Sequence, residues 1–338
     1  MIRTALHKAI ERQDLTRQEA FAAMEAIMSG EATPAQIGAF LVALRMKGET
    51  PQEIAGFAES MRHKATAVPY TAPAAPLLDI VGTGGDGKHT FNVSTVAAFV
   101  VAGAGIPVAK HGNRSVSSKC GSADVLSALG VNIELEAEQM SRCLDEVGMA
   151  FLFAPKLHGA MKYAIGPRRD IAVRTVFNIL GPITNPAGTR HQLIGVYDMT
   201  LTRLLAEVLQ QLDAEHIWLV HSEDGLDEIS LAAKTHVAEL HNGEIREYQV
   251  DAADFGLSPS AESITGGDAE ENAAIAERIL RGEHGVKRDV VIANAAAALY
   301  IAGAAADLRE AAGMAAESLD NGSAFKTLEA MRQFTQSV

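Results

Sequence analysis

Residues 79–95 read Asp-Ile-Val-Gly-Thr-Gly-Gly-Asp-Gly-Lys-His-Thr-Phe-Asn-Val-Ser-Thr, an apolar run that ends in a glycine-rich turn. The segment 77–81 is apolar except for Asp79, which is typical of a buried parallel strand. The glycines that follow leave room for backbone N–H groups to close around an anion: Gly82, Gly84, Gly85 and Gly87. The pattern predicts a strand followed by an anion-binding loop.

An apolar helix is predicted directly after this loop, over residues 96–104. Ser94 and Thr95 are suited to cap its first turn. The positive amino end of a helix favours the same anion as the loop. Strand, loop and helix together predict a phosphate-binding site.

The loop also satisfies the Gly-x-Gly-x-x-Gly spacing of dinucleotide sites between Gly82 and Gly87, which is weak evidence by itself. Such sites carry a ribose-binding acid about 20 residues further on, yet no acidic residue occurs between Asp86 and Asp124. A nucleoside-triphosphate loop does not fit either, because the Gly-Lys pair is followed by His89 instead of Ser or Thr. We therefore predict a phosphate site without a dinucleotide.

A second polar cluster, residues 110–122, reads Lys-His-Gly-Asn-Arg-Ser-Val-Ser-Ser-Lys-Cys-Gly-Ser and follows a strand predicted near 106–109. A short helix that ends at Gly130 is predicted after it. A solvated surface loop is the alternative interpretation of this cluster. Because ligands bind at the carboxyl ends of parallel strands, we expect both loops to belong to one site.

Eight motifs, in this order and spacing, resemble the anthranilate phosphoribosyltransferase family over nearly the whole chain. They are Gly-Thr-Gly-Gly-Asp (82–86), Asn-Val-Ser-Thr (92–95), Lys-His-Gly-Asn-Arg-Ser-Val-Ser-Ser (110–118), Gly-Ser-Ala-Asp-Val-Leu (121–126), Phe-Leu-Phe-Ala-Pro (151–155), Arg-Thr-Val-Phe-Asn-Ile-Leu-Gly-Pro (174–182), Asn-Pro (185–186) and Gly-Leu-Asp-Glu-Ile-Ser (225–230). The resemblance implies transfer of the phosphoribosyl group from phosphoribosyl pyrophosphate to anthranilate. The products would be N-(5-phosphoribosyl)anthranilate and pyrophosphate, in the second step of tryptophan synthesis from chorismate.

Length and composition limit the possible classes of protein. The chain has 338 residues, of which 48% are hydrophobic, so two structural parts with a large core are expected. No apolar run of about 18 residues and no signal-peptide pattern occur, so no membrane association is expected. Cys120 and Cys143 lack metal or disulfide spacing, which favours a reducing, cytoplasmic location. The net charge of −13 opposes broad nucleic-acid binding.

We expect an α/β protein in which a small helical domain adjoins a larger α/β domain with a mostly parallel central sheet, as in the nucleoside phosphorylase and phosphoribosyltransferase type. Residues 1–66 are predicted to be helical, and residues 66–76 read as a linker. Segments 77–156 and 191–338 are assigned to the phosphoribosyl-binding α/β domain. Residues near 157–190 lack a clear strand and are expected to return to the helical domain.

The resemblance places phosphoribosyl pyrophosphate against the two polar loops and the helix start. Its leaving group carries several negative charges, so N–H, hydroxyl and ammonium donors should stabilise its departure. An ordinary tight turn is the alternative interpretation of the glycines. The residues expected to contact this substrate are Gly82, Gly84, Gly85, Asp86, Thr90, Asn92, Ser94, Thr95, Lys110, Ser118 and Ser122.

Magnesium is the expected cofactor, because Mg²⁺ prefers oxygen ligands and accompanies pyrophosphate chemistry. Asp227 and Glu228 supply adjacent carboxylates, and the resemblance implies that they bind the metal together with Ser94. An exposed acidic turn is the alternative interpretation of residues 223–228.

The resemblance also implies an anthranilate pocket. Arg168 stands at the family's position for the carboxylate, which a guanidinium can bind through two hydrogen bonds. Without the resemblance, a surface ion pair would be the ordinary interpretation of Arg168. Gly82, His111, Asn113 and His158 complete the expected pocket. We assign no general base, because positioning of the two substrates can matter more than proton transfer.

Two features depart from the usual family pattern. Gly159 stands where many members have proline, and Ile171-Ala172 stands where Leu-Gly is common. Both flank Arg168, so they bear on the shape of the anthranilate pocket and leave the phosphate motifs intact.

Two other functions remain open at this point: a pyrimidine nucleoside phosphorylase, and a nucleic-acid-binding relative of the same fold. Asn113, Arg114 and the Asp227-Glu228 pair fit the transferase better than the phosphorylase.

We also expect the active site in a cleft between the two parts. A homodimer through the N-terminal helices is expected because their apolar faces exceed what a small helical layer can bury.

Overall fold

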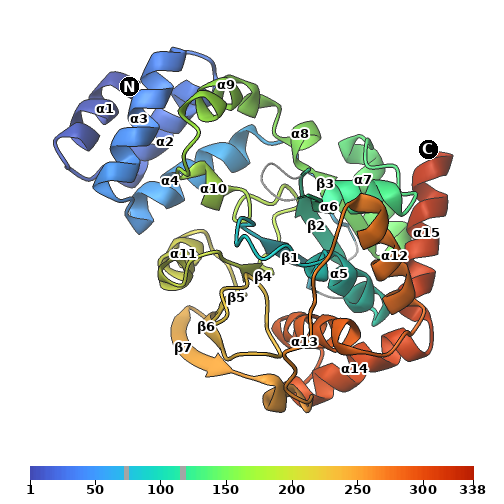
Figure 1. Cartoon of the computed structure of the whole chain (residues 1–338). Helices are drawn as coiled ribbons and strands as arrows, with labels where there is room; N and C mark the ends of the chain where they lie inside the picture. Colours follow the sequence, from blue (N-terminus) through green and yellow to red (C-terminus); the bar gives the residue numbers. More distant parts are fainter. Residues whose placement is uncertain (72–75, 115–118) are drawn as a thin grey trace.

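The computed structural model describes residues 1–71, 76–114 and 119–338. Its N-terminal part consists of helices alone (Figure 1). Thr33 and Thr50 each cap a helix through a capping box and are followed by proline at the first helical position. Phe40 and Phe57 pack edge to face in the core of this bundle, with ring centroids 6.1 Å apart. The helices are α1 (Ile2–Ile10), α2 (Arg17–Met28), α3 (Pro34–Lys47) and α4 (Pro51–Lys64).

A seven-stranded sheet forms the larger part, with the strand order β3-β2-β1-β4-β5-β6-β7. The first five strands in this order pair in parallel, whereas β6 and β7 pair antiparallel. The mostly parallel sheet expected from the sequence is therefore confirmed. The strands are β1 (Leu78–Gly82), β2 (Val108–Gly112), β3 (Met149–Phe153), β4 (His191–Gly195), β5 (His216–Ser222), β6 (Thr235–His241) and β7 (Glu244–Val250).

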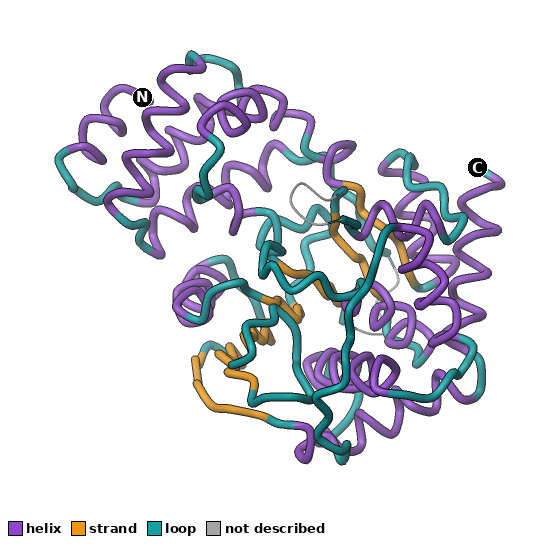
Figure 2. Tube along the Cα trace, viewed as in Figure 1, coloured by secondary structure: helices purple, strands orange, loops and turns teal. Residues whose placement is uncertain are grey.

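Helices cover both faces of this sheet, as Figure 2 shows. Leu193 and Ile194, neighbours on β4, point into two different cores because successive strand residues face opposite sides. The core around Ile194 is continuous with that of the N-terminal helices and includes α11 (Thr200–Gln211). The other core is covered by α5 (Val93–Gly103), α6 (Ser122–Ala128), α7 (Ala137–Val147), α12 (Ala269–Leu280), α13 (Val286–Ile301), α14 (Leu308–Asp320) and α15 (Ser323–Ser337).

The segment between β3 and β4 lies against the N-terminal helices. Ala164 is buried in the same core as α1 to α4, and Ile171 lies close to Gly38 of α3. The boundaries given above for the two domains stay a prediction. The segment holds α8 (Ala154–Leu157), the 3₁₀ turn η1 (Gly159–Met161), α9 (Lys162–Ile171) and α10 (Phe177–Leu180); a second 3₁₀ turn, η2 (Ala252–Phe255), follows β7.

Among the residues that the structure describes, no helix is long and apolar enough to span a bilayer.

Candidate active site

The glycine loop begins where β1 ends, at the carboxyl edge of the parallel strands. Gly84, Gly85 and Gly87 have φ angles of +63°, +80° and +73°, which glycine adopts without strain. A Cβ atom on Gly82 would lie 2.9 Å from Oδ2 of Asp227. The Gly84 N–H donates to the same carboxylate oxygen over 3.0 Å. The loop is therefore closed against the acidic turn that follows β5.

The start of α5 corrects one detail of the sequence interpretation. The helix begins at Val93, so Ser94 and Thr95 lie in its first turn and do not cap a helix that starts at residue 96. The Ser94 N–H donates to Oε1 of Glu228 over 3.2 Å, because the free N–H groups of a helix start attract an acceptor. Thr95 is buried, and its hydroxyl oxygen has no hydrogen-bond partner among the described residues.

Lys110 and His111 are strand residues of β2, where a turn was expected. The strand continues to Gly112 because its parallel pairing with β3 extends that far. Lys110 is 2% exposed, and its ammonium group donates to the Ile80 carbonyl and, over 3.3 Å, to Oγ of Ser94. Strand β2 thus positions the Lys110 ammonium group beside the start of α5.

Three carboxyl groups lie near one another here, and one of them, that of Glu228, is next to Lys110. Burial raises the pKa of Asp227, and the nearby Asp86 carboxylate raises it further. Burial and the charge of Asp227 likewise raise the pKa of Glu228. Oδ2 of Asp86 is buried without a hydrogen-bond partner among the described residues. The three carboxyl groups outnumber the single buried ammonium, so the donor set fits a hard divalent cation such as Mg²⁺.

Two histidines meet beside this cluster, one from β2 and one from the segment after α8. The rings of His111 and His158 lie 5.1 Å apart, and Nδ1 of His111 bonds the Gly181 carbonyl over 3.1 Å. Burial lowers the pKa of His111 to about 3 and that of His158 to about 4, so both rings are neutral near pH 7. Nε2 of each ring has no hydrogen-bond partner among the described residues. The two Nε2 atoms, one on the sheet and one on the helical segment, are therefore available to hydrogen-bond a substrate.

Three more of the predicted residues have contacts of their own. Arg168, on α9, is partly buried and lies over the Phe177 ring, 5.0 Å from its centroid. Asn113 is exposed just after β2, and its carbonyl accepts from Oγ of Ser122 over 3.3 Å. Asn92 is held by Asn272, whose Nδ2 donates to Oδ1 of Asn92 over 3.0 Å.

Two further predictions concern positions outside this network. Thr90 forms an isolated backbone bridge with Thr265 and is partly buried. Ser118 lies outside the described residues.

Two matching family models cover most of the chain. Residues 3–65 match a model described as "Glycosyl transferase family, helical bundle domain", and residues 74–325 match "Glycosyl transferase family, a/b domain". An anthranilate phosphoribosyltransferase from Moorella thermoacetica is 54% identical over 339 residues, covering 100% of this chain and 99% of the relative. One from Symbiobacterium thermophilum is 52% identical, covering 99% and 98%. The chain belongs to the anthranilate phosphoribosyltransferase family.

Solved structures of this family agree with the assignment. The crystal structure of anthranilate phosphoribosyltransferase from Thermus thermophilus superposes with a TM-score of 0.93 at 43% identity, covering 98% of this chain and 99% of that one. The Saccharomyces cerevisiae anthranilate phosphoribosyltransferase in complex with PRPP (phosphoribosyl pyrophosphate) and Mg gives 0.89 at 26% identity, covering 100% and 98%. The same yeast protein in complex with 4-fluoroanthranilate gives 0.88 at 25%, with the same coverage. The family and fold that the motifs predicted are confirmed, and they favour the transferase over the phosphorylase.

Sequence reasoning counted neither Asp79 nor Arg174 among the site residues. Asp79 is fully buried and accepts hydrogen bonds from the His111 N–H and from Nδ2 of Asn185, over 3.2 and 2.8 Å. Arg174 donates to the Gly85 carbonyl and lies 4.0 Å from the centroid of the Tyr197 ring. The signals were present, since Asp79 interrupts an apolar strand and Arg174 opens one of the family motifs.

Proposed function

We propose that this chain transfers the phosphoribosyl group of phosphoribosyl pyrophosphate to anthranilate, releasing pyrophosphate, as a step of tryptophan biosynthesis. The observation that carries the proposal is that, at the carboxyl ends of the strands, the glycine loop bonds Asp227 and the start of α5 bonds Glu228. Membership of the family and the high identity to its curated members support it.

Phosphoribosyl pyrophosphate is proposed to bind between the glycine loop, the start of α5 and Lys110. Backbone N–H groups and the helix start favour its phosphates, and the hydroxyls of Ser94 and Thr95 add donors. Lys110 lies where an ammonium can offset negative charge on this substrate. Gly82 lets the Asp227 carboxylate lie against the loop, because any Cβ there would meet Asp227.

Magnesium is proposed to bind Asp227, Glu228 and Ser94, as the bound Mg in a yeast relative suggests. When bound, Mg²⁺ stabilises the negative charge on the departing pyrophosphate. Without a cation, the two carboxyl groups repel each other, which is the charge pattern expected of a metal site.

Anthranilate is proposed to bind between α9 and β2. The Arg168 guanidinium is suited to its carboxylate and packs against the Phe177 ring. The neutral rings of His111 and His158, together with Asn113, offer polar atoms to the amine. We assign no general base, and we infer that these residues orient the amine nitrogen toward the anomeric carbon.

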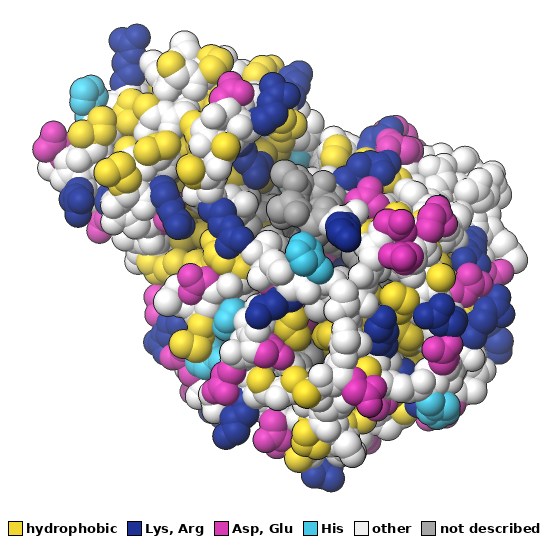
Figure 3. Space-filling model, viewed as in Figure 1, with side chains coloured by type: hydrophobic (Ala, Val, Ile, Leu, Met, Phe, Trp, Pro, Cys, Tyr) yellow, Lys and Arg dark blue, Asp and Glu magenta, His cyan; other side chains and the backbone are white. Residues whose placement is uncertain are grey.

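A homodimer through the N-terminal helices is a further part of the proposal. Met1, Ile10 and Met46, on and beside α1 and α3, are 73%, 59% and 71% exposed. Figure 3 shows hydrophobic side chains gathered on this part of the surface. Sedimentation should give a dimer at micromolar concentration, and a monomer would contradict the proposal.

A cytoplasmic location is likewise proposed.

The loss of anthranilate fluorescence in the presence of phosphoribosyl pyrophosphate and Mg²⁺ tests the proposed reaction. We expect the signal to fall only when both substrates and the metal are present. Phosphate-dependent release of a free base from a pyrimidine nucleoside would support the phosphorylase instead, and salt-sensitive DNA binding without turnover would support a nucleic-acid-binding protein.

A further inference from the structure

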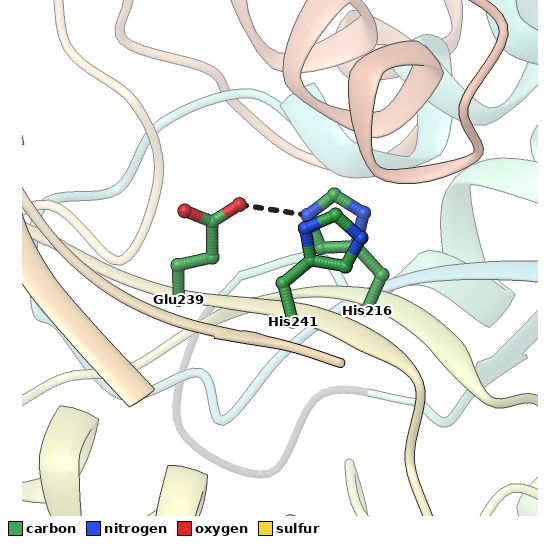
Figure 4. A group of neighbouring side chains, drawn as sticks. All are labelled: His216, Glu239 and His241. Carbon is green, nitrogen blue, oxygen red and sulfur yellow. Dashed lines mark hydrogen bonds and ion pairs between the residues drawn. The ribbon is translucent and has the colours of Figure 1, made fainter. Parts of the chain in front are cut away.

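A cluster of two histidines and a glutamate lies on the sheet away from the glycine loop: His216, Glu239 and His241 (Figure 4). His216 is the first residue of β5, so it stands at the amino edge, whereas the active-site loops follow the carboxyl ends. One ligand atom from each residue lies within 4.8 Å of the other two. Within the described ranges, this is the one group of metal-ligating side chains found so close together.

The strand register brings the three side chains to one face. Glu239 and His241 are two residues apart on β6, and side chains at that spacing point to the same side of a strand. His216 pairs directly with His241 across β5 and β6. Directly opposed residues have Cβ atoms about 5 Å apart, so the backbone itself places the ligands together.

The carboxylate is held in place by groups outside the cluster. Nε1 of Trp218 donates to Oε1 of Glu239 over 3.1 Å, and the Tyr248 hydroxyl donates to Oε2 over 3.0 Å. His216 and Glu239 are buried, whereas His241 is exposed. Such hydrogen-bonded partners orient metal ligands, and the exposed side gives an ion a path of entry.

The imidazole rings lie close to coordinating positions. The rings of His216 and His241 stack with centroids 4.0 Å apart and an interplanar angle of 9°. Nε2 of His216 lies 2.8 Å from Oε1 of Glu239, and in Figure 4 both rings turn a nitrogen toward the carboxylate. Zn²⁺ binds imidazole nitrogens at about 2.1 Å, so one ion bound to both rings requires the exposed His241 ring to turn.

We propose that His216, Glu239 and His241 bind one divalent transition-metal ion of the Zn²⁺ class. Two imidazoles and one carboxylate suit such an ion better than Mg²⁺, which prefers oxygen alone, and the fourth position is open to water. This site is separate from the magnesium site proposed at Asp227 and Glu228. It joins β5 to the antiparallel hairpin, so its role is structural.

The single tryptophan of the chain, Trp218, bonds Glu239, so its emission can report an ion bound at this site. We would titrate the tag-free chain with Ni²⁺ in excess Mg²⁺, which occupies the oxygen site, and follow tryptophan emission. Paramagnetic Ni²⁺ should quench Trp218 saturably at one ion per chain, and Zn²⁺ should restore the emission by displacing Ni²⁺. His241→Ala should weaken the apparent affinity by more than about tenfold, since even loss of a partner outside the ligand set costs that much.

His236→Ala is the matched control. His236 also lies on β6, but an odd number of residues from His241 and therefore on the other face, where it is 3.4 Å from Glu247. Its quenching curve should match that of the unsubstituted chain. Because His241 is exposed, the emission of metal-free His241→Ala should also be unchanged, which shows that the fold is retained. Quenching that does not saturate at one ion, or that persists unchanged in His241→Ala, would overturn the proposal.

Discussion

Asp79 illustrates how one buried residue connects the elements that carry the site. Its buried carboxyl group accepts from the His111 N–H on the neighbouring strand and from the side chains of Asn185 and Gln192, over 3.2, 2.8 and 3.4 Å. Burial raises the pKa of Asp79 to about 6. These bonds join β1, β2 and the segment before β4, so they fix where His111 and Lys110 lie relative to the glycine loop.

At the same scale, Arg168→Ala should mainly raise the KM for anthranilate. The carboxylate loses a charge-assisted hydrogen bond, a loss of roughly 1.5–3 kcal/mol, or about 10- to 150-fold. Steady-state kinetics with each substrate varied in turn checks this. Arg169→Ala, at an exposed neighbouring position, is the control and should leave both KM values unchanged. A raised KM for phosphoribosyl pyrophosphate alone would show that the two pockets are wrongly assigned.

Substitution of Asp227 and Glu228 together should affect kcat instead of the KM for anthranilate. Asp227→Asn combined with Glu228→Gln should lower kcat and weaken the dependence of the rate on Mg²⁺, because the ion loses its proposed carboxylate ligands. A series of rate measurements against Mg²⁺ concentration tests the expectation. Glu223→Gln, in the same turn but bonded to Gln249, should behave like the unsubstituted enzyme. An unchanged Mg²⁺ dependence in the double variant would place the metal elsewhere.

At the scale of elements, the end of β4 holds the acidic turn in position. Gly195 is the last residue of β4, and a Cβ atom there would lie 1.6 Å from the Asp227 carbonyl oxygen. The Gly195 carbonyl also accepts from the Thr83 N–H of the glycine loop over 2.9 Å. The end of β4 therefore contacts both the glycine loop and the acidic turn that holds Asp227.

Gly195→Ala should for this reason reduce kcat by about 100-fold, since a displacement of about 1 Å at a catalytic site can cost that much. The added methyl group forces the Asp227 backbone away from its place. Gly313→Ala, in α14, meets no atom within 4 Å and is the control. If Gly195→Ala retained full activity, the proposed link between β4 and the acidic turn would be wrong.

The elements also show how far the sequence predicts the structure. Parallel strands and glycine loops were predictable because apolar runs and turn residues are local signals. The β6–β7 hairpin was missed, although Asn242-Gly243 at its turn, with φ angles of +52° and +78°, is a strong local hairpin signal. Arg174 was given no role for another reason: a motif marks the residue, but its contact with Gly85 spans 89 residues, and no local pattern identifies that partner.

At the scale of the whole molecule, His158 lies where the helical part meets the sheet. Its neighbours include Met28 and Met61 of the N-terminal helices, and its ring faces His111 of β2. Burial keeps the ring neutral, with a pKa of about 4. Protonation of His158 would therefore place an unpaired charge between the two parts.

The stability of the molecule should depend on pH through this residue. An unfolded chain protonates histidine near pH 6.5, whereas folded His158 takes up its proton only near pH 4. Stability from the neutral ring is therefore lost as the pH falls from about 6.5 to about 4, by up to ~1.4 kcal/mol per pH unit. Urea unfolding at pH 7 and pH 5 should show a smaller loss in His158→Asn than in the unsubstituted chain. The exposed His63→Asn serves as the control, and equal losses in all three would contradict the argument.

The most direct test of the proposed function follows one substrate and one product of the same reaction. Anthranilate, phosphoribosyl pyrophosphate and Mg²⁺ are mixed with the purified chain, and anthranilate consumption and pyrophosphate release are followed together. The account predicts one pyrophosphate released for each anthranilate consumed, with no reaction when Mg²⁺ is chelated. Pyrophosphate release that continues at the same rate without anthranilate, or no consumption of anthranilate at all, would contradict it.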